Sequence, residues 1–373
     1  MSKLKNRILT AIFVLFIFSF AVLLAVLPKK ERSENEKRVL ASFPEITVNS
    51  ISNGEFALEL ETYLSDHFPF REKFVGLDAY MGLLLGQNGE NGIYFGKDGY
   101  LITEPPEFEM SRAEKNAGYI ENFVSETNLP SSVIIVPSTG FVYSEKLPKN
   151  HKVYRDDEII DTVRENTKSA SFIDLRKCFN DNKNRIQIYY KTDHHLTSQG
   201  SMLVYNEFCR EKKITPANFT LQEKIEKFYG TCYSKSGFWG TKGDTVELYK
   251  TETSYTVTIN DGKNIKTNNS LYFYEHLDNL DKYPVFLDGN HALVKIKNKQ
   301  VNNGKKLLIV KDSYAHCFTT FLAENYEEII MVDLRYYKKS VKELASEEEF
   351  SELLFMFGSE NISTSTDFAW LLM

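Results

Sequence analysis

The sequence predicts an α/β protein with a parallel β-sheet, attached to a membrane by one N-terminal helix. Three observations support this fold class. Short, wholly apolar runs alternate with helical patterns after residue 111, and one uncharged run of 20 residues lies near the N-terminus. The composition, 42% hydrophobic and 26% charged, is that of a globular protein. Apolar strands that alternate with helices are typical of a sheet covered on both faces.

The uncharged run is Ile8–Leu27, which at 1.5 Å per residue spans a hydrocarbon core of ~30 Å. Lys3, Lys5 and Arg7 precede it, and Pro28 with two lysines follows. A cleaved signal peptide is the alternative, but its apolar core is normally ~7–15 residues long. We expect an uncleaved single-pass anchor in the cell membrane. The N-terminal positive charges predict a cytoplasmic N-terminus and an extracytoplasmic bulk.

Charge and cysteine content argue against nucleic-acid binding and against two cysteine motifs. After residue 30 the chain has 40 basic and 51 acidic residues, an excess of negative charge that repels nucleic-acid backbones. The scattered cysteines form no CxxC pair, which excludes a zinc ribbon and a thioredoxin-type motif and leaves one disulfide bridge open. They are Cys178, Cys209, Cys232 and Cys317.

Between the membrane segment and residue 110 the patterns predict a stalk, helices and a hairpin. Residues 31–45 are polar and charged before they turn apolar, as in a stalk. Residues 56–85 have helical apolar spacing, interrupted at Pro69. Gly92–Ile102 reads as a hairpin whose turn is Lys97–Gly99.

The α/β part begins with a helix, for which Ser111 and Glu114 predict a capping box. Pro130 ends this helix, and an apolar strand follows. The remaining expected elements, in order, are strand Val133–Val136, a helix around Ile159–Val163, strand Phe172–Ile173, strand Ile186–Tyr190, a helix capped at Thr197, strand Leu307–Val310, a helix near 314–324 and strand Ile329–Val332.

The alternation stops between about residues 215 and 305. Thr245–Tyr249 and Tyr255–Ile259 look like strands, and Asp261-Gly262 supplies a turn. This segment is interpreted as a β-rich insertion. The expected division is therefore a cytoplasmic stub and anchor (1–30), a stalk with a helical and hairpin region (31–110), and an α/β domain with the insertion (111–373).

Two groups of reactive side chains follow predicted strands, and ligands of open parallel sheets bind beyond the carboxyl ends of the strands. Ser313 follows the strand that ends at Val310 and precedes a helix, where backbone amides can stabilise an oxyanion. Asp193 and His195 follow the strand that ends at Tyr190. Two residues apart in an extended segment, they project to one side, and such a histidine can deprotonate a serine.

Each of these residues also has a structural interpretation. A serine before a helix is often a cap. Asp193-His194-His195 also fits a hydrogen-bonded helix entrance or a metal site, but adjacent histidines are expected to point apart and no third spaced ligand stands out. We therefore expect neither metal nor cofactor. A second pair, Asp66-His67, lies away from a strand end and favours capping or packing.

Several short motifs, in this order and spacing, resemble the DHHW protein family, relatives of the SGNH-hydrolase-like acetyltransferases of alginate O-acetylation. The similarity covers nearly everything after the anchor. The motifs are Asp66–Arg71, Tyr94–Leu101, Thr192–Thr197, Phe228–Gly237, Gly289–His291 and Lys311–Ala315. One departure is Leu196, which stands where the family motif has tryptophan and removes any aromatic sugar contact made there.

The resemblance implies an SGNH-hydrolase-like three-layer α/β/α sandwich. Asp193 and His195 precede the serine, Ser313, an order permuted relative to ordinary SGNH hydrolases. It further implies extracytoplasmic acetyl transfer to a cell-surface polysaccharide, with a membrane-bound O-acyltransferase partner as acetyl donor. Asn290 is similar to the asparagine of the oxyanion hole, to which the backbone at Ser313 would also contribute.

The leading hypothesis is a polysaccharide O-acetyltransferase with an acetyl-Ser313 intermediate, in which Asp193 orients His195 and His195 acts as base and then acid. A carbohydrate acetylesterase is the nearest alternative, because water can also attack the acyl-enzyme. A non-catalytic surface protein that binds glycan or docks an acyltransferase is the alternative from another class.

Overall fold

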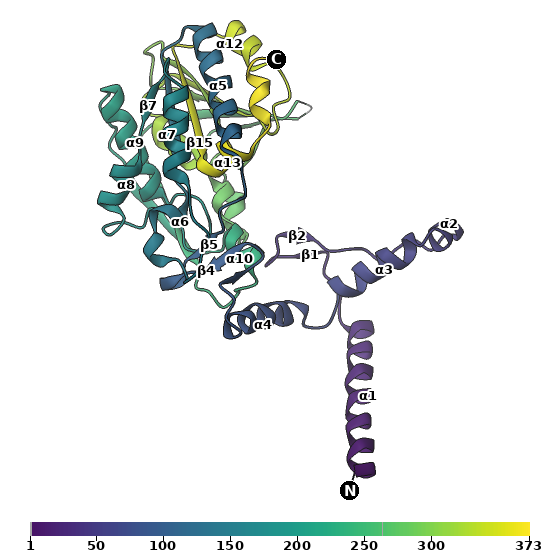
Figure 1. The fold of residues 1–373 in the computed structure, drawn as a ribbon. Coiled ribbons are helices and arrows are strands. Elements are labelled where there is room, and N and C mark those ends of the chain that lie inside the picture. The colour runs from purple at the N-terminus through teal and green to yellow at the C-terminus, as the bar shows by residue number, and fades with distance from the viewer. Residues whose placement is uncertain (1, 263) are drawn as a thin grey trace.

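The computed structural model describes residues 2–262 and 264–373 (Figure 1). Within them, eight strands form one large sheet. In spatial order these are β11 (Ile265–Asn268), β10 (Tyr255–Asn260), β12 (Leu293–Asn298), β14 (Glu328–Asp333), β13 (Lys306–Lys311), β15 (Glu352–Gly358), β6 (Ser131–Val136) and β7 (Ser171–Ile173). The five strands from β14 to β7 are parallel, whereas β12, β10 and β11 pair antiparallel. The sheet is therefore mixed and mostly parallel.

Helices cover both faces of this sheet, because successive side chains of each parallel strand point to opposite faces. On one face Ile135, Val310 and Phe355 pack under α5 (Met110–Thr127), α7 (Asp156–Asn166), α12 (Val341–Glu347) and α13 (Ser359–Thr364). On the other face Ile134, Ile309 and Leu354 pack under α8 (Arg176–Asn182), α9 (Ser198–Lys212) and α11 (Ala315–Leu322). The apolar runs of the sequence are thus buried on both sides, as expected for parallel strands.

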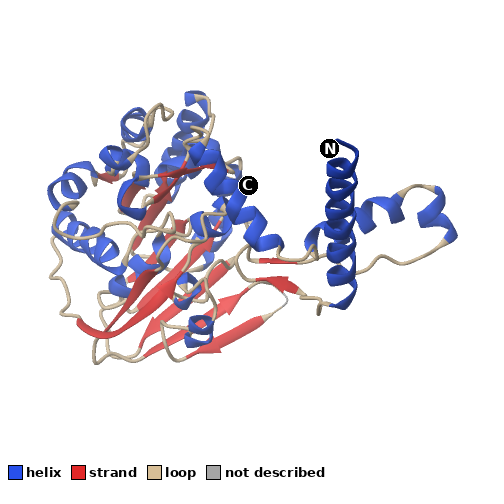
Figure 2. Ribbon diagram, turned by 90° about the horizontal axis from the view of Figure 1, so that it is seen from below, coloured by secondary structure: helices blue, strands red, loops and turns tan. Residues whose placement is uncertain are grey.

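The N-terminal third lies beside the α/β body, and α1 and its neighbouring helices are set apart to one side of it (Figure 2). Its elements are α1 (Ser2–Val26), β1 (Arg32–Ser33), β2 (Arg38–Val39), α2 (Val48–Ser52), α3 (Glu55–Asp66), α4 (Arg71–Leu84), β3 (Gly89–Glu90), β4 (Ile93–Phe95) and β5 (Leu101–Thr103). The predicted helical break at Pro69 and the hairpin are confirmed. Asp98 and Gly99 adopt positive φ in its turn (58° and 79°), which glycine tolerates at no steric cost.

Helix α1 is long and apolar enough to cross a membrane. The candidate span Lys3–Val26 has a mean hydropathy of 2.9, and none of it is buried against the rest of the described chain. A helix of this kind near the N-terminus serves as a membrane anchor or as a signal sequence.

The predicted strand Ile186–Tyr190 is wrong. Ile188–Tyr190 are buried and residues 186–187 are half-buried, but the segment forms only one isolated bridge, between Tyr189 and Leu196. Backbone groups of this segment form hydrogen bonds outside a strand ladder instead: the Ile188 N–H donates to the Tyr143 hydroxyl (2.9 Å), and the Thr197 N–H donates to the Ile188 carbonyl (2.8 Å). An apolar run buried under a loop has the same sequence pattern as a buried strand.

The capping box at Ser111 is also wrong, because α5 begins one residue earlier and its N-cap, Glu109, makes no side-chain cap. The cap at Thr197 is confirmed, since its hydroxyl accepts a hydrogen bond from the Gly200 N–H at 3.0 Å. All four cysteines are free thiols, so no disulfide bridge forms among them.

The expected β-rich insertion contains β8 (Thr220–Phe228), β9 (Asp244–Lys250), β10, β11 and β12, with the short helix α10 (Thr231–Ser236). β8 and β9 form a separate two-stranded sheet. The other three extend the main sheet, because β12 pairs with β14 along Leu293–Lys297. The segment is therefore partly a continuation of the core sheet and not only an insertion into it. The proposed boundaries at residues 30 and 110 stay a prediction.

Candidate active site

Ser313 and the loop around Asp193 meet at the carboxyl edge of the parallel strands. Ser313 lies two residues beyond the end of β13 and two residues before the start of α11 at Ala315. The 191–195 loop bends back on itself, and the Tyr190 N–H donates to the His195 carbonyl at 3.1 Å. Asp193 and His195 therefore come together through a bent loop, and not as alternate residues of an extended strand.

The three side chains form a hydrogen-bonded row. The Nδ1 atom of His195 lies 2.5 Å from Asp193 Oδ1, and its Nε2 atom lies 2.8 Å from Ser313 Oγ. An ionised carboxylate can only accept, so Nδ1 carries the hydrogen and donates it to Asp193. Nε2 then has a free lone pair that accepts the hydrogen of the Ser313 hydroxyl. This is the arrangement that general-base activation of a serine requires.

Asp193 is 1% exposed, and donors surround its carboxylate. Oδ1 also accepts from the His195 N–H (2.9 Å), and Oδ2 accepts from the Thr231 N–H (2.6 Å) at the start of α10. A Cβ on Gly230 would lie 2.3 Å from Oδ2, so only glycine allows this approach. Burial alone would raise the pKa of Asp193, but His195, His194 and the hydrogen bond from His195 hold that pKa well below its usual range.

Two tyrosines hold the histidines in place. The ring of Tyr283 stacks on that of His195, with centroids 3.8 Å apart and an interplanar angle of 8°. Its hydroxyl donates to the Ser313 carbonyl at 3.0 Å, so one side chain contacts both residues. The Tyr314 hydroxyl donates to the His194 carbonyl at 3.0 Å, which ties the two loops together.

A hydrogen bond from the neighbouring strand β15 holds the turn that carries Ser313. Asp312 is buried, and its carboxylate accepts from the Tyr314 N–H (3.0 Å) and the Gly358 N–H (2.7 Å). A Cβ on Gly358 would lie 2.6 Å from the Tyr314 ring. The position of Ser313 therefore depends on close contact between the ends of β13 and β15.

Two groups are candidates to bind an oxyanion. The Ser313 N–H donates to no acceptor among the described residues, which leaves it free for a ligand. Asn290 is exposed, and its side-chain oxygen accepts from Arg335 Nη2 at 3.2 Å. Arg335 follows β14, so Asn290 lies at the same edge of the sheet as Ser313. Its part in an oxyanion hole stays a prediction.

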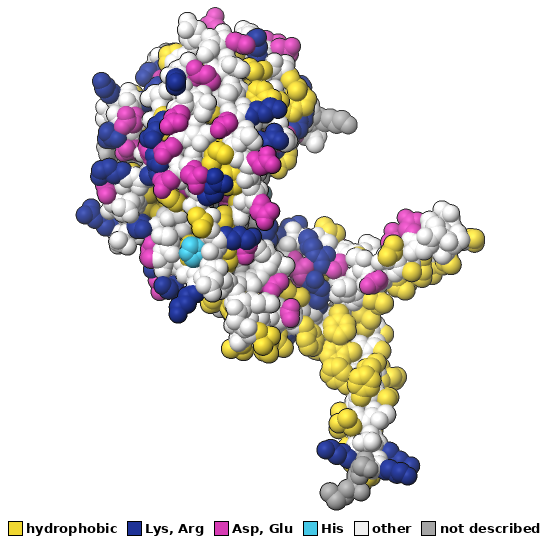
Figure 3. Space-filling model, viewed as in Figure 1, with side chains coloured by type: hydrophobic (Ala, Val, Ile, Leu, Met, Phe, Trp, Pro, Cys, Tyr) yellow, Lys and Arg dark blue, Asp and Glu magenta, His cyan; other side chains and the backbone are white. Residues whose placement is uncertain are grey.

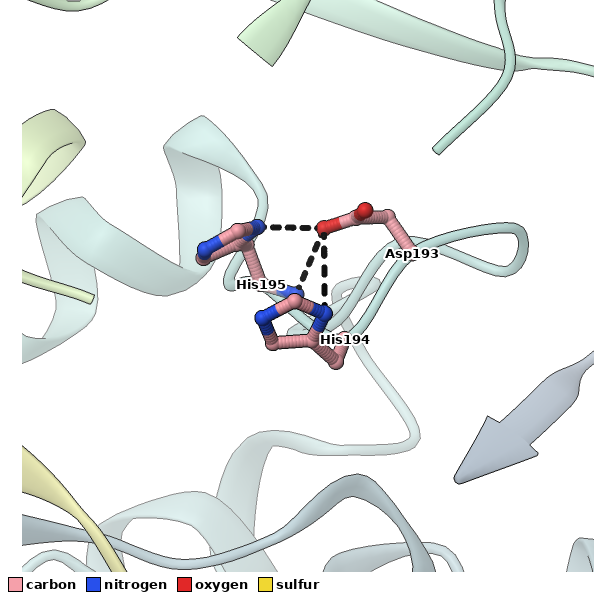
Figure 4. Close-up of side chains that lie close together, drawn as sticks. All are labelled: Asp193, His194 and His195. Carbon is pink, nitrogen blue, oxygen red and sulfur yellow. Dashed lines mark hydrogen bonds and ion pairs between the residues drawn. The ribbon is translucent and has the colours of Figure 1, made fainter. Parts of the chain in front are cut away.

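His194 lies beside His195, so the expectation that the two histidines point apart is wrong. Their ring centroids are 4.0 Å apart, because the loop bends and its side chains do not alternate (Figure 4). Ligand atoms of Asp193, His194 and His195 all lie within 4.8 Å of one another, a spacing that a metal ion can bridge. Both ring nitrogens of His195 are engaged by Asp193 and Ser313, however, so a cation on His195 would displace one of these contacts.

Behind Ser313 lies a buried charged cluster. Lys311 Nζ contacts His316 Nε2 at 2.7 Å and Asp333 Oδ2 at 3.1 Å, and Arg335 pairs with the same carboxylate at 2.6 Å. Burial and the adjacent Lys311 lower the pKa of His316 well below its usual value. His316 is therefore neutral and accepts a hydrogen bond from Lys311, which orients the first turn of α11.

The comparison with known proteins covers the part of the chain that contains this site. Residues 173–332 match the family model of DHHW proteins. The DHHW resemblance is confirmed. The matched DHHW region contains Asp193, His195 and Ser313.

Two curated relatives are both named "Probable alginate O-acetylase AlgJ". The protein from Pseudomonas putida is 25% identical over 171 residues, which is 43% of this chain and 44% of the relative. The protein from Pseudomonas syringae pv. tomato is 21% identical over 173 residues, 44% of each chain. The alignment thus spans less than half the length of these relatives.

Two solved structures share the fold. A DHHW family protein from Eubacterium siraeum has a TM-score of 0.63 and 21% identity, over 75% of this chain and 95% of that one. Bacillus cereus PatB1, solved with a sulfonyl adduct, has a TM-score of 0.62 and 19% identity, over 74% and 97%. A mixed α/β fold with a large, mostly parallel sheet is therefore common to all three.

Sequence reasoning missed several residues that position the site. Gly230 and Thr231 belong to the Phe228–Gly237 motif, but nothing in the sequence indicates that this motif contacts Asp193. Tyr283 carries no motif at all, and only its stacking on His195 reveals it.

Proposed function

We propose that this protein is an extracytoplasmic O-acetyltransferase that acts on a cell-surface polysaccharide through an acetyl-Ser313 intermediate. The observation that carries the proposal is the hydrogen-bonded row from Asp193 through His195 to Ser313. The relatives named alginate O-acetylase support the substrate class, because alginate is a polysaccharide and an O-acetylase modifies its hydroxyl groups.

In the first half-reaction, Ser313 Oγ attacks the acetyl carbonyl of the donor while His195 Nε2 takes the hydroxyl proton. The bond between the acetyl group and its donor breaks, and the leaving group takes the proton from His195. In the second half-reaction, a sugar hydroxyl gives its proton to Nε2 and attacks the acetyl-serine. The bond to Oγ then breaks, and Ser313 recovers the proton. The Ser313 N–H and the Asn290 amide would stabilise the oxyanion in both.

The donor in this proposal is a membrane-bound O-acyltransferase partner that passes the acetyl group across the bilayer. The candidate anchor α1 would hold the chain beside such a partner, with the bulk of the chain outside the cytoplasm. The chemistry uses side chains of this chain alone, so no cofactor is required.

The test is the acetylation of the full chain in detergent by p-nitrophenyl acetate, followed by intact and peptide mass. We expect wild type to gain one acetyl group on the peptide that contains Ser313, and Ser313→Ala to gain none there. A matched control is Ser52→Ala, an exposed serine on α2, which should label like wild type.

Other outcomes select between functions. Acetylation of Ser313→Ala equal to that of wild type would contradict the proposed nucleophile. If neither protein is labelled while a control serine esterase is, the non-catalytic glycan-binding or docking interpretation takes its place. If the acetyl-enzyme forms but releases acetate at the same rate with and without oligosaccharide acceptor, the protein is an esterase.

A further inference from the structure

Helix α4 has an apolar stripe that the described chain leaves uncovered. The stripe consists of Phe74, Leu77, Met81 and Leu84, spaced by three, four and three residues, so that all four lie on one face of the helix, and the exposed N-cap residue Phe70 precedes it. Their exposed fractions lie between 43% and 81%. Monomeric soluble proteins rarely leave such a contiguous apolar surface open to water.

The opposite face of α4 packs against the rest of the protein. Ala79, with Tyr80 and Leu83, packs against Phe238 in a separate small core, and the Tyr80 hydroxyl accepts from the Gly240 N–H at 3.2 Å. Helix α4 is therefore attached firmly to the body through one side. The stripe on its other side cannot turn inward without breaking these contacts.

The stripe is continuous with the apolar surface of α1. The Phe20 ring stacks on that of Phe68, with centroids 5.2 Å apart, and lies 6.0 Å from that of Phe74. Phe20 precedes Val26, the last residue of α1, by six residues, or about 9 Å along the helix axis. The stripe thus begins level with the last turns of the candidate span. At that level a bilayer crossed by α1 would change from acyl chains to headgroups.

Figure 3 shows the same relationship on the surface: hydrophobic side chains gather on the half of α1 nearest the rest of the protein and continue along the edges of α3 and α4 on the side from which α1 projects. Basic residues border this surface. Lys29, Lys30 and Lys73 line a pocket of about 360 Å³ between the end of α1 and the turn before α4, together with Phe68 and Phe70. Apolar side chains at acyl depth with lysines at headgroup depth are the signature of an interfacial helix.

We propose that the stripe of α4 lies on the outer surface of the lipid bilayer that α1 crosses. The chain is then held at two places, by a spanning helix and by a surface helix. A single spanning helix leaves the body free to swing, whereas this second contact sets the orientation of the body relative to the bilayer.

The test uses the full chain with Cys178→Ser, because Cys178 is the half-buried native thiol and the other three are buried. Single cysteines at Leu77, Leu84, Phe16 and Met373 are labelled with an environment-sensitive fluorophore. The protein is reconstituted into vesicles of phosphatidylcholine and phosphatidylglycerol that contain doxyl-labelled lipid. Met373 is a matched exposed apolar control, 63% exposed and at the end of the molecule away from α1.

We expect several-fold stronger quenching at Leu77→Cys and Leu84→Cys than at Met373→Cys, approaching that at Phe16→Cys inside α1. Adding Leu77→Asp and Leu84→Asp should abolish the quenching of a label at Phe74→Cys and leave that at Phe16→Cys unchanged. Absence of quenching at Leu77 and Leu84 overturns the proposal, whatever happens at Phe16. The proposal is also overturned if these cysteines are shielded from labelling in native membranes but are not quenched in vesicles that contain this chain alone. In that case a membrane protein, and not lipid, covers the stripe.

Discussion

The carboxylate of Asp193 accepts three hydrogen bonds, two from His195 and one from Thr231. Neutral asparagine at this position can present its NH₂ group to Nδ1, which would favour the wrong tautomer of His195. If the proposed function holds, Asp193→Asn should slow acetylation of Ser313 by on the order of 10⁴-fold. The measurement is the rate of p-nitrophenol release in the burst phase.

The second Asp-His pair provides the control for that variant. Asp66 is paired with Arg38 and accepts from the Ala41 N–H at 2.9 Å, and His67 contacts the Ala41 carbonyl, so both residues are structural. Asp66→Asn should leave the burst rate near that of wild type. Equal loss in both variants would mean that the effect at Asp193 is on folding and not on the histidine tautomer.

Glu360 in α13 is a residue whose ionisation opposes folding. Burial and the nearby negative charge of Asp156 raise its pKa to about 7, against about 4.3 for an unfolded chain. Between about pH 4.3 and about pH 7, Glu360 carries a proton in the folded state but has lost it in the unfolded state. The stabilisation that this proton gives the folded state is complete below about pH 4.3. It is lost as pH rises through about 7.

The free energy of unfolding should therefore fall as pH rises from about 4.3 to about 7, and Glu360→Gln should remove part of that slope. Urea denaturation of the chain in detergent across this range, followed by circular dichroism, measures it. Glu158→Gln on the exposed surface of α7 should retain the wild-type slope. An unchanged slope in Glu360→Gln would contradict the prediction.

At the scale of elements, β15 is an interior strand that connects two parts of the sheet. It lies between β13 and β6 with parallel pairing on both sides, and its Gly358 N–H binds Asp312 next to Ser313. It therefore joins the early strands β6 and β7 to the late strands β13 and β14. The last fifth of the chain completes the centre of a sheet that began at residue 131.

Leu354 at the middle of β15 is 1% exposed, and truncation there leaves a cavity in a close-packed core. Leu354→Ala should lower the free energy of unfolding by about 2–5 kcal/mol. Leu221→Ala on β8, where the side chain is 40% exposed, should cost much less. Denaturant unfolding of both variants measures the difference, and similar values would mean that β15 does not pack as described.

At the scale of the whole molecule, contacts connect the candidate active site to the N-terminal elements. Thr231 of α10 binds Asp193, and α10 packs on the β3–β5 sheet. Between β1 and β2, Lys37 pairs with Asp281 at 2.7 Å, two residues before Tyr283. The proposed bilayer contact of α1 and α4 would therefore also set the orientation of Ser313. In the proposed reaction this would present the serine to a donor in the same membrane.

The sequence by itself determined the local features: the apolar span of α1, the break at Pro69, the turn at Gly99, the cap at Thr197 and the apolar strands. Each depends on residues close together in the chain, where side-chain period and turn chemistry decide the structure. The resemblance to DHHW proteins, carried by short motifs, selected Asp193, His195 and Ser313 as one candidate site.

Only the tertiary structure decided the rest. Ile186–Tyr190 reads as a strand, because burial produces the same apolar pattern whether or not a neighbouring strand is present to pair with it. Whether β10–β12 would join the main sheet or form a separate insertion depended on pairing with β14, far along the chain. His195 and Ser313 are 118 residues apart, and their 2.8 Å contact exists because β13 and the loop before α9 end at the same edge of the sheet.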